Sequence, residues 1–239
     1  MNFKNKAAFI TGAGRGIGKA IALGMPARGA DLILADIHEE NLNKVAAEAE
    51  ALGANVKKAV LDVSDEAAVR ATIDESIREF GQIHILVNNA GIYRPNDFLT
   101  ATSDVWKTCI DINILGTMYP TQAILPHMIQ HGYGRIVNIG SVAGEYGINY
   151  FVDYSMTKGA IISFTKALAK LVADKGVTVN CVSPGSIDVT GAGGMEELSF
   201  IGRAGTPEEC ANLVMFVASD EASYISGQNY LVDGCRKKM

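Results

Sequence analysis

The stretch "KAAFITGAGRGIGKAIALGM", residues 6–25, decides the fold of this chain. An apolar run leads into the glycine-rich turn "TGAGRGIG", residues 11–18, and the turn passes directly into an amphipathic segment with helical spacing. A strand, a glycine turn and a helix in this order direct backbone N–H groups and the positive end of the helix dipole at one point, where a phosphate can bind. A purely structural turn is the alternative for a glycine pattern, but its place between strand and helix favours a nucleotide site.

Six further apolar runs repeat this alternation of short strand-like and longer helix-like segments. They are "DLILAD", "NVKKAVLDV", "HILVNNAG", "RIVNIG", "TVNCVSPG" and "NYLVDG". Because the runs are apolar almost throughout instead of alternating, they are typical of parallel strands that are covered on both faces. The pattern predicts one α/β domain over residues 1–239, with a doubly wound, parallel, seven-stranded sheet and helices on both faces, the Rossmann fold.

Two features interrupt the regular pattern. Residues 184–205 lack clear periodicity and are rich in glycine, so we expect a substrate loop at about residues 186–205. Pro26 and Pro120 fall inside helix-like segments, where a proline removes a hydrogen bond at a cost of about 3 kcal/mol. We therefore expect a kink or an early helix end at each proline.

Composition and charge exclude several classes of function. The 239 residues are 48% hydrophobic, and their net charge of −5 disfavours nucleic acid and anionic membranes as partners. No run approaches the roughly 18 apolar residues of a spanning helix, and the first apolar run is too short for a signal peptide, so we expect a cytoplasmic protein. The four cysteines form no C-x-x-C pair. His127 and His131 have a spacing that metals use, but no further ligand lies near them, and we expect no metal site.

The second strand-like run ends in Asp36, 18 residues after Gly18. At that place a carboxylate can accept hydrogen bonds from the adenosine ribose of a dinucleotide. A ribose 2′-phosphate would be repelled, by about 4 kcal/mol for two unit charges 4 Å apart at an effective dielectric constant of 20. The sequence therefore favours NAD over NADP, although Arg15 within the turn could reach a 2′-phosphate. Without the upstream glycines, a turn or a helix cap would be the better interpretation of Asp36.

Tyr154 and Lys158 stand four residues apart in "NYFVDYSMTKGAIISF", so both can face one side of a helix. An ammonium near a phenol lowers the pKa of the phenol from about 10 and suits it for proton transfer. Taken alone, such a pair is better explained as two surface residues of an amphipathic helix. Two further residues strengthen the functional interpretation. Ser141 follows "RIVNIG" at the sheet edge where α/β proteins bind ligands, and Asn113 is a polar residue inside an apolar helix pattern.

Together these residues closely resemble the short-chain dehydrogenase/reductase family, and the match runs over almost the whole chain. The shared motifs are the T-G-x-x-x-G-x-G turn at residues 11–18, Asp36, "DV" at 62–63, "NNAG" at 88–91, Asn113, Ser141, Tyr154, Lys158 and "PG" at 184–185. Several independent motifs in the family's order make the resemblance specific.

The resemblance implies a role for each site residue. Tyr154 exchanges a proton with the substrate oxygen, and Lys158 lowers the pKa of Tyr154 and holds the nicotinamide ribose. Ser141 orients the substrate oxygen, and Asn113 fixes a water that links Lys158 to solvent. The residues implied to bind the dinucleotide are Thr11, Gly12, Arg15, Gly16, Ile17, Gly18, Asp36, Ile37, Asp62, Val63, Asn89, Ala90, Gly91, Tyr154, Lys158, Pro184, Gly185, Ile187 and Thr190.

The chain departs from the family's pattern near its C-terminal end. Val189 stands where many relatives have a threonine, so the contact to the cofactor's carboxamide is made by Thr190 or is missing. The loop that follows is several residues shorter than usual, which leaves the pocket more open. Cys235 replaces a glycine of the common "V-D-G-G" ending, a change to which we attach little functional weight.

These features predict an NAD(H)-dependent oxidoreductase that interconverts a secondary alcohol and a ketone by hydride transfer, with Tyr154 as general acid and base. One alternative is an NADPH-dependent 3-oxoacyl-(acyl carrier protein) reductase, which "GRIVNIGSVAG" and "TVNCVSPG" resemble. Another is a non-catalytic NAD-binding sensor or scaffold. The resemblance also implies a homotetramer or homodimer built on helices at about residues 103–131 and 150–174, although their apolar residues would equally suit the core.

Overall fold

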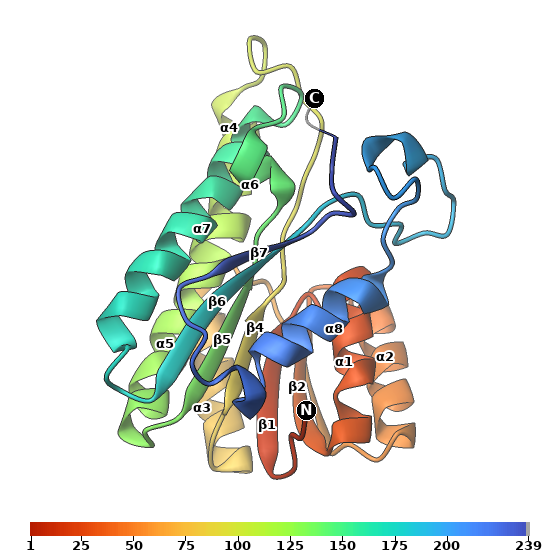
Figure 1. Ribbon diagram of the computed structural model, residues 1–239. Coiled ribbons are helices and arrows are strands. Elements are labelled where there is room, and N and C mark those ends of the chain that lie inside the picture. The colour runs from red at the N-terminus through yellow and green to blue at the C-terminus, as the bar shows by residue number, and fades with distance from the viewer. Residues whose placement is uncertain (238–239) are drawn as a thin grey trace.

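Seven parallel strands form one sheet in the computed structural model, which describes residues 1–237 of the chain (Figure 1). Their order across the sheet is β3-β2-β1-β4-β5-β6-β7. The strands are β1 Lys6–Thr11, β2 Ala30–Asp36, β3 Val56–Val60, β4 Ile85–Asn88, β5 Gly134–Ile139, β6 Val177–Pro184 and β7 Asn229–Val232. The prediction of a doubly wound, seven-stranded parallel sheet is confirmed. Residues 238 and 239, at the end of the predicted domain, lie outside the described residues.

Helices cover both faces of this sheet (Figure 1). One face packs against α1, α2 and α8, and the other against α3, α5 and α7. Along β1, Ala8 and Ile10 join the first of these layers while Ala7 and Phe9 join the second, which explains why the strand is apolar at every position. The α-helices are α1 Gly16–Gly24, α2 Glu39–Ala51, α3 Glu66–Phe80, α4 Ser103–Ile110, α5 Gly116–Gln130, α6 Val142–Tyr146, α7 Val152–Val172 and α8 Pro207–Val217. Four shorter segments are the 3₁₀ turns η1 Pro26–Arg28, η3 Glu196–Leu198 and η4 Asp220–Ala222, and the π-helical η2 Asp111–Leu115.

The two prolines in helix-like segments behave differently. α1 ends at Gly24, and Pro26 begins the 3₁₀ turn η1, so an early helix end is confirmed there. Pro120 lies inside α5 and does not end it. Of the two expected outcomes, an early helix end is therefore wrong at Pro120, while a kink there stays a prediction. Pro120 is buried, and packing of α5 outweighs the loss of one helical hydrogen bond.

The apolar residues of the two long helical segments divide between core and surface. Ile124, Ile161 and Leu168 are buried, so the core explains these three. Met118 is 41% exposed and remains on the surface. Within residues 1–237, no helix is both long enough and apolar enough to cross a membrane.

A close contact between α6 and α7 determines how these helices sit over the end of β5. Gly144 on α6 faces the α7 backbone, and a Cβ atom there would lie 2.5 Å from the carbonyl carbon of Lys158 and 2.6 Å from the amide nitrogen of Gly159. Gly159 has room on its own side, because a Cβ atom there would meet only the Gly144 carbonyl oxygen, at 3.4 Å. The two helices therefore approach each other only because position 144 has no side chain.

We predict opposite effects for two alanine substitutions at this contact. Gly144→Ala should lower the free energy of unfolding by about 1–3 kcal/mol, since the backbones must move apart. Gly159→Ala is the matched control and should be neutral or stabilising, because alanine favours a helix interior by up to about 1 kcal/mol over glycine. Urea unfolding of both variants measures the difference, and equal stabilities would contradict this account of the packing.

Candidate active site

The glycines of the turn after β1 let its backbone pack closely on itself and on the segment after β4. Gly12 and Gly16 have positive φ angles of 63° and 55°, which would strain any other residue. A Cβ atom at Gly18 would run into the carbonyl oxygen of Gly12, and one at Gly12 would lie 2.9 Å from Cα of Ala90. Arg15, the N-cap residue of α1, makes no side-chain capping bond. The start of α1 can therefore offer its N–H groups to an anion.

The carboxylate of Asp36 closes one side of this turn. Its Oδ2 accepts a hydrogen bond from the Gly14 N–H at 2.8 Å, and its Oδ1 accepts one from the His38 N–H at 2.9 Å. Each oxygen has capacity for a further hydrogen bond. Residues that flank Asp36 and the turn line a hollow of about 370 Å³, namely Arg15, Ile37, His38, Glu39, Glu40 and Asn41. The two glutamates add negative charge to that of Asp36.

Predicted cofactor residues near β2 and β3 differ in their surroundings. Asp62 is exposed, and its carboxylate accepts hydrogen bonds from the N–H and the hydroxyl of Ser64 at 2.9 and 2.7 Å. Ile37 is also exposed. Val63 is buried and packs on the start of α5, while Ile17 is half-buried against the core. Ile37 and Asp62 are thus open to a ligand, whereas Val63 and Ile17 support the fold beneath.

The "NNAG" segment after β4 is bonded directly to the glycine turn. The Thr11 hydroxyl accepts hydrogen bonds from the N–H groups of Asn89 and Ala90, both at 3.0 Å. In return, the Asn89 side-chain amide donates to the carbonyls of Thr11 and Gly12 at 3.0 and 2.9 Å. The strand order reverses between β1 and β4, so these two turns border the crevice in which open α/β sheets bind ligands.

Asn113 is fully buried in the π-helical segment η2. Its Oδ1 accepts from the Ile92 N–H at 2.8 Å, and its Nδ2 donates to the Ile92 carbonyl at 2.9 Å and to the Thr157 hydroxyl at 3.1 Å. These hydrogen bonds satisfy the buried Asn113 amide, and they explain why a polar residue stands within an apolar helix pattern. A Cβ atom at Gly91 would lie 3.1 Å from Asn113 Oδ1 and 3.5 Å from Lys158 Nζ, so these side chains meet beside Gly91.

Lys158, on α7, is buried against the end of β5. Its Nζ donates to the Ile139 carbonyl at 2.7 Å and lies 5.8 Å from the ring centroid of Tyr154. Burial lowers the pKa of Lys158 from 10.5 to about 8. The ammonium form still predominates at neutral pH, and it has two further N–H donors besides the one bonded to Ile139.

Tyr154 stands one turn before Lys158 on α7 and lies near Ser141. Ser141 is the N-cap of α6, where its Oγ accepts from the Ala143 N–H at 3.1 Å. Burial raises the pKa of Tyr154 to about 12, and the interaction with Ser141 opposes that rise. Lys158 is not among the groups that shift the pKa of Tyr154, so the expected lowering of that pKa by the amine does not appear in this structure, where loss of solvent dominates the phenol.

Aromatic rings surround Tyr154 on one side. The ring centroids of Tyr93 and Phe151 lie 5.8 and 6.0 Å from that of Tyr154. Phe151 in turn contacts Tyr150, at 4.8 Å between centroids. Tyr150 also lines a hollow of about 660 Å³, formed by residues 95–99 and 149–150. An aromatic wall thus connects Tyr154 with this hollow.

The chain after β6 is held at the base of the predicted substrate loop. Pro184 ends β6 and is buried, and the Gly185 N–H bonds to the Val232 carbonyl of β7 at 2.9 Å. Ile187 pairs with Gly205, so the two ends of the loop lie side by side. These contacts place residues 184–187 at the same sheet edge as Tyr154.

Farther along, this loop reaches the glycine turn. A Cβ atom at Gly16 would lie 3.3 Å from Cγ1 of Val189, so Val189 packs on the turn. Thr190 is exposed, and its hydroxyl bonds to the Asp188 carboxylate at 3.1 Å. An apolar side chain therefore contacts the turn from the position where many relatives carry a threonine.

The predicted residues gather at the carboxyl edge of the strands, and some act in ways that sequence reasoning misses. Asn113, Ser141, Tyr154 and Lys158 come together, while Arg15, Ile37 and Thr190 lie on the exposed rim. Ile92 and Ile139 take part through their backbone, so their side chains give no signal in the sequence. In the part of the chain that the structure describes, no three or more His, Cys, Asp or Glu residues are grouped to hold a metal ion.

Comparison with known proteins places the chain among oxidoreductases. A family model described as enoyl-(acyl carrier protein) reductase matches residues 12–235. The chain is 40% identical over 242 residues to 3-oxoacyl-(acyl-carrier-protein) reductase FabG of Escherichia coli, covering 98% of each protein. It is 37% identical over 238 residues to cyclohexanol dehydrogenase of an Acinetobacter species, covering 97% of this chain and 95% of that protein.

Solved structures agree with this placement. NAD⁺-bound xylitol dehydrogenase superposes with a TM-score of 0.92 at 31% identity, covering 98% of this chain and all of that one. A 3-oxoacyl-(acyl-carrier protein) reductase with bound NAD from Brucella melitensis superposes with a TM-score of 0.90 at 32% identity, covering 97% of this chain and 90% of that one. This chain therefore belongs to the short-chain dehydrogenase/reductase family, whose members are oxidoreductases acting on CH–OH groups and ketones.

Proposed function

We propose that this enzyme reduces the 3-oxo group of an acyl thioester to a hydroxyl group with NADH, and catalyses the reverse oxidation with NAD⁺. The observation that carries the proposal is the meeting of Ser141, Tyr154 and Lys158 beside the crevice between β1 and β4. The 3-oxoacyl reductases among the relatives support this substrate class more directly than an unspecified secondary alcohol. The proposal therefore combines the 3-oxoacyl reductase, the first alternative that the sequence offers, with NAD(H), the cofactor that the sequence favours.

Tyr154 is the proton donor in reduction. Its raised pKa keeps the phenol protonated at neutral pH, so it can protonate the substrate oxygen as negative charge develops there. Ser141 lies near Tyr154, and its hydroxyl orients the same substrate oxygen by a second hydrogen bond. When bound, NADH supplies the hydride that the carbonyl carbon takes up. In oxidation, the Tyr154 phenolate removes the proton from the alcohol.

Lys158 and Asn113 support this proton transfer. The two remaining N–H donors of Lys158 suit a ribose hydroxyl and the phenolate that Tyr154 becomes during reduction. Asn113 acts through the backbone, because it holds Ile92 and so fixes Gly91 next to Lys158. We therefore assign Asn113 a positioning role, and the bridging water stays a prediction.

NAD(H) suits the residues of the crevice better than NADP(H). The glycine turn and the uncapped start of α1 fit a pyrophosphate, and the Asp36 carboxylate fits two ribose hydroxyls. A 2′-phosphate would meet Asp36, Glu39 and Glu40, with Arg15 as the one cation lining that hollow among the described residues. NAD is also the cofactor named in two similar structures.

A dehydrogenase of small cyclic alcohols is the second candidate. Cyclohexanol dehydrogenase is nearly as similar to this chain as the 3-oxoacyl reductases are. The loop after β6 is short, which also suits a small substrate. The acyl thioester is still favoured, because 3-oxoacyl reductases recur among both the similar sequences and the similar structures.

A homotetramer or homodimer and a cytoplasmic location stay predictions. Exposed Met118, Val152 and Met156 on the two long helical segments support an association face. Light scattering measures the oligomeric state.

We expect purified protein to oxidise NADH with acetoacetyl-coenzyme A, a 3-oxoacyl thioester, and to act more slowly on cyclohexanol with NAD⁺. Nicotinamide absorbance follows both reactions. Tyr154→Phe removes only the proton donor and should lower kcat by about 10²- to 10⁴-fold. Tyr224→Phe, on a fully exposed tyrosine, is the matched control and should keep the wild-type rate. Faster turnover of cyclohexanol would replace the proposal by the second candidate.

The raised pKa of Tyr154 predicts opposite pH profiles for the two directions. Below about pH 12 the phenol is the major form, so reduction has its proton donor throughout the neutral range. Oxidation needs the phenolate, whose share rises about tenfold per pH unit below the pKa. We expect kcat/KM for alcohol oxidation to increase from pH 6 to pH 9 while that for reduction stays level or falls. Oxidation that is independent of pH would count against Tyr154 as the base.

Removing the charge of Asp36 should shift the cofactor preference. Asp36→Asn is expected to raise the ratio of kcat/KM for NADPH to that for NADH by about 10- to 100-fold, because one carboxylate no longer repels the 2′-phosphate. Asp31→Asn, at the other end of the same strand, removes an equal charge far from the turn and is the control. A wild-type enzyme that already prefers NADPH would reject the proposed cofactor.

A further inference from the structure

The C-terminal tail forms a short backbone pairing with the predicted substrate loop. We name residues 234–237 the tail segment and residues 198–201 the loop return. Arg236 and Ser199 form an antiparallel bridge between them. Three backbone hydrogen bonds join the same segments, from Phe200 N–H to Cys235 carbonyl at 3.0 Å, Ile201 N–H to Gly234 carbonyl at 3.2 Å, and Lys237 N–H to Leu198 carbonyl at 3.1 Å.

The backbone conformation of Gly234 and Cys235 allows this pairing. Their φ angles are 61° and 57°, so two successive residues lie in the left-handed region. Such a conformation turns the chain sharply after β7, and a non-glycine residue adopts it only at some cost. Cys235 is therefore part of the turn that brings the tail segment to the loop, although its replacement of a glycine was expected to have little functional effect.

Arg236 connects the tail segment to the other end of the loop. While its backbone pairs with Ser199, its Nη1 donates to the Ser186 hydroxyl at 2.9 Å. Ser186 lies between Gly185 and Ile187, both predicted cofactor residues, and its carbonyl accepts the Gly205 N–H at 2.9 Å. One residue thus contacts the beginning of the loop with its side chain and the loop return with its backbone.

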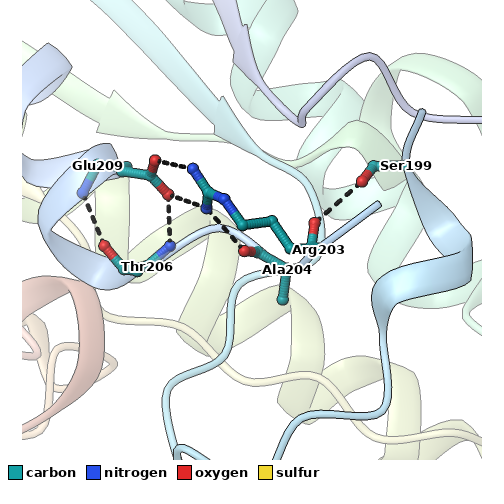
Figure 2. Close-up of polar contacts among 5 residues, drawn as sticks. All are labelled: Ser199, Arg203, Ala204, Thr206 and Glu209. Carbon is teal, nitrogen blue, oxygen red and sulfur yellow. Dashed lines mark hydrogen bonds and ion pairs between the residues drawn. The ribbon is translucent and has the colours of Figure 1, made fainter. Parts of the chain in front are cut away.

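A second set of contacts holds the end of the loop to α8 (Figure 2). The Glu209 carboxylate accepts from the Thr206 N–H at 2.9 Å and pairs with both guanidinium nitrogens of Arg203, and the Thr206 hydroxyl caps α8 in return. The Ser199 hydroxyl donates to the Arg203 carbonyl at 2.9 Å, as Figure 2 also shows. Ser199 therefore connects the α8 contacts to the tail segment. A displacement of the tail segment would move the loop return and, through Arg203, the end of the loop at α8.

We propose that the tail segment is a positioning element for the active site, and that Arg236 sets the placement of residues 184–187 and of the loop return. This inference rests on the proposed function, because it assigns the loop to the cofactor and substrate. Arg236 acts through Ser186 and touches neither reacting group. Its loss should therefore weaken binding more than it slows the chemical step.

The test compares three full-length variants. Arg236→Met keeps the apolar stem but removes the donor to Ser186, and Arg236→Lys restores a single donor. Lys237→Met removes the neighbouring charge, which lies 5.5 Å from the ring centroid of Phe200, while its backbone N–H still bonds to Leu198. We expect Arg236→Met to raise KM for NADH and for acetoacetyl-coenzyme A about five- to tenfold, with kcat within about threefold of wild type. Arg236→Lys should recover part of the loss. Lys237→Met, which loses only the weak contact with Phe200 and no contact with Ser186, should raise KM less than Arg236→Met does.

Hydrogen exchange of the amides of residues 186–188 and 198–202, measured without ligands, separates this inference from the proposed function. Arg236→Met should accelerate exchange in both segments, even if no substrate is ever turned over. A chain ending at Asp233, which keeps β7 intact, should accelerate it further. Unchanged exchange and KM in Arg236→Met, or equal effects of Arg236→Met and Lys237→Met, would overturn the assignment. Absence of turnover in the wild type would reject only the proposed function.

Discussion

The hydrogen bonds between Thr11 and the segment Asn89–Ala90 hold the two halves of this active site together. β1 and β4 are neighbours, but the helices that follow them go to opposite faces of the sheet, so the chain diverges at this point. One hydroxyl accepts two backbone N–H groups, and the Asn89 amide returns two bonds to carbonyls of the turn. The spacing of the crevice follows from these four bonds. The glycine turn lies on one side of them, and Gly91 with its neighbours Asn113 and Lys158 lies on the other.

Burial decides the electrostatics of the proton-transfer residues. A phenol and an amine on one helix face would attract each other in water, and the phenol would become more acidic. In the folded chain both groups lose solvent, which disfavours each charged form, so the pKa of Tyr154 rises while that of Lys158 falls. Ser141 is the neighbour that lowers the pKa of Tyr154. The resting site therefore holds a protonated acid, which suits reduction of a carbonyl.

In the proposed function, the cofactor and the substrate contact different parts of the molecule. Acidic residues around the first two strands favour a ribose without a phosphate, and this feature is local to the turn and to the beginning of α2. The aromatic wall and the hollow near Tyr150 belong to the segments after β4 and β5. The proposed preference for NAD(H) and the proposed acyl thioester substrate therefore rest on separate groups of residues.

Sequence patterns alone were enough to predict the fold, the order of the strands along the chain and the motifs that follow each strand. Apolar runs specify buried parallel strands, and parallel strands bring their ends, including Ser141, to one edge of the sheet. That Tyr154 and Lys158 on α7 join Ser141 there was implied by the resemblance to the family and not by the strand pattern. Other features become visible only in the folded chain. Pro120 stays inside a helix, and Arg236 donates a hydrogen bond back to Ser186. Ile92 and Ile139 contribute to the site through their carbonyls. The reason is that these outcomes depend on burial and on contacts between distant segments. Spacing along the chain tells which face of a helix a residue occupies, but not how much water that face retains or which backbone group lies opposite.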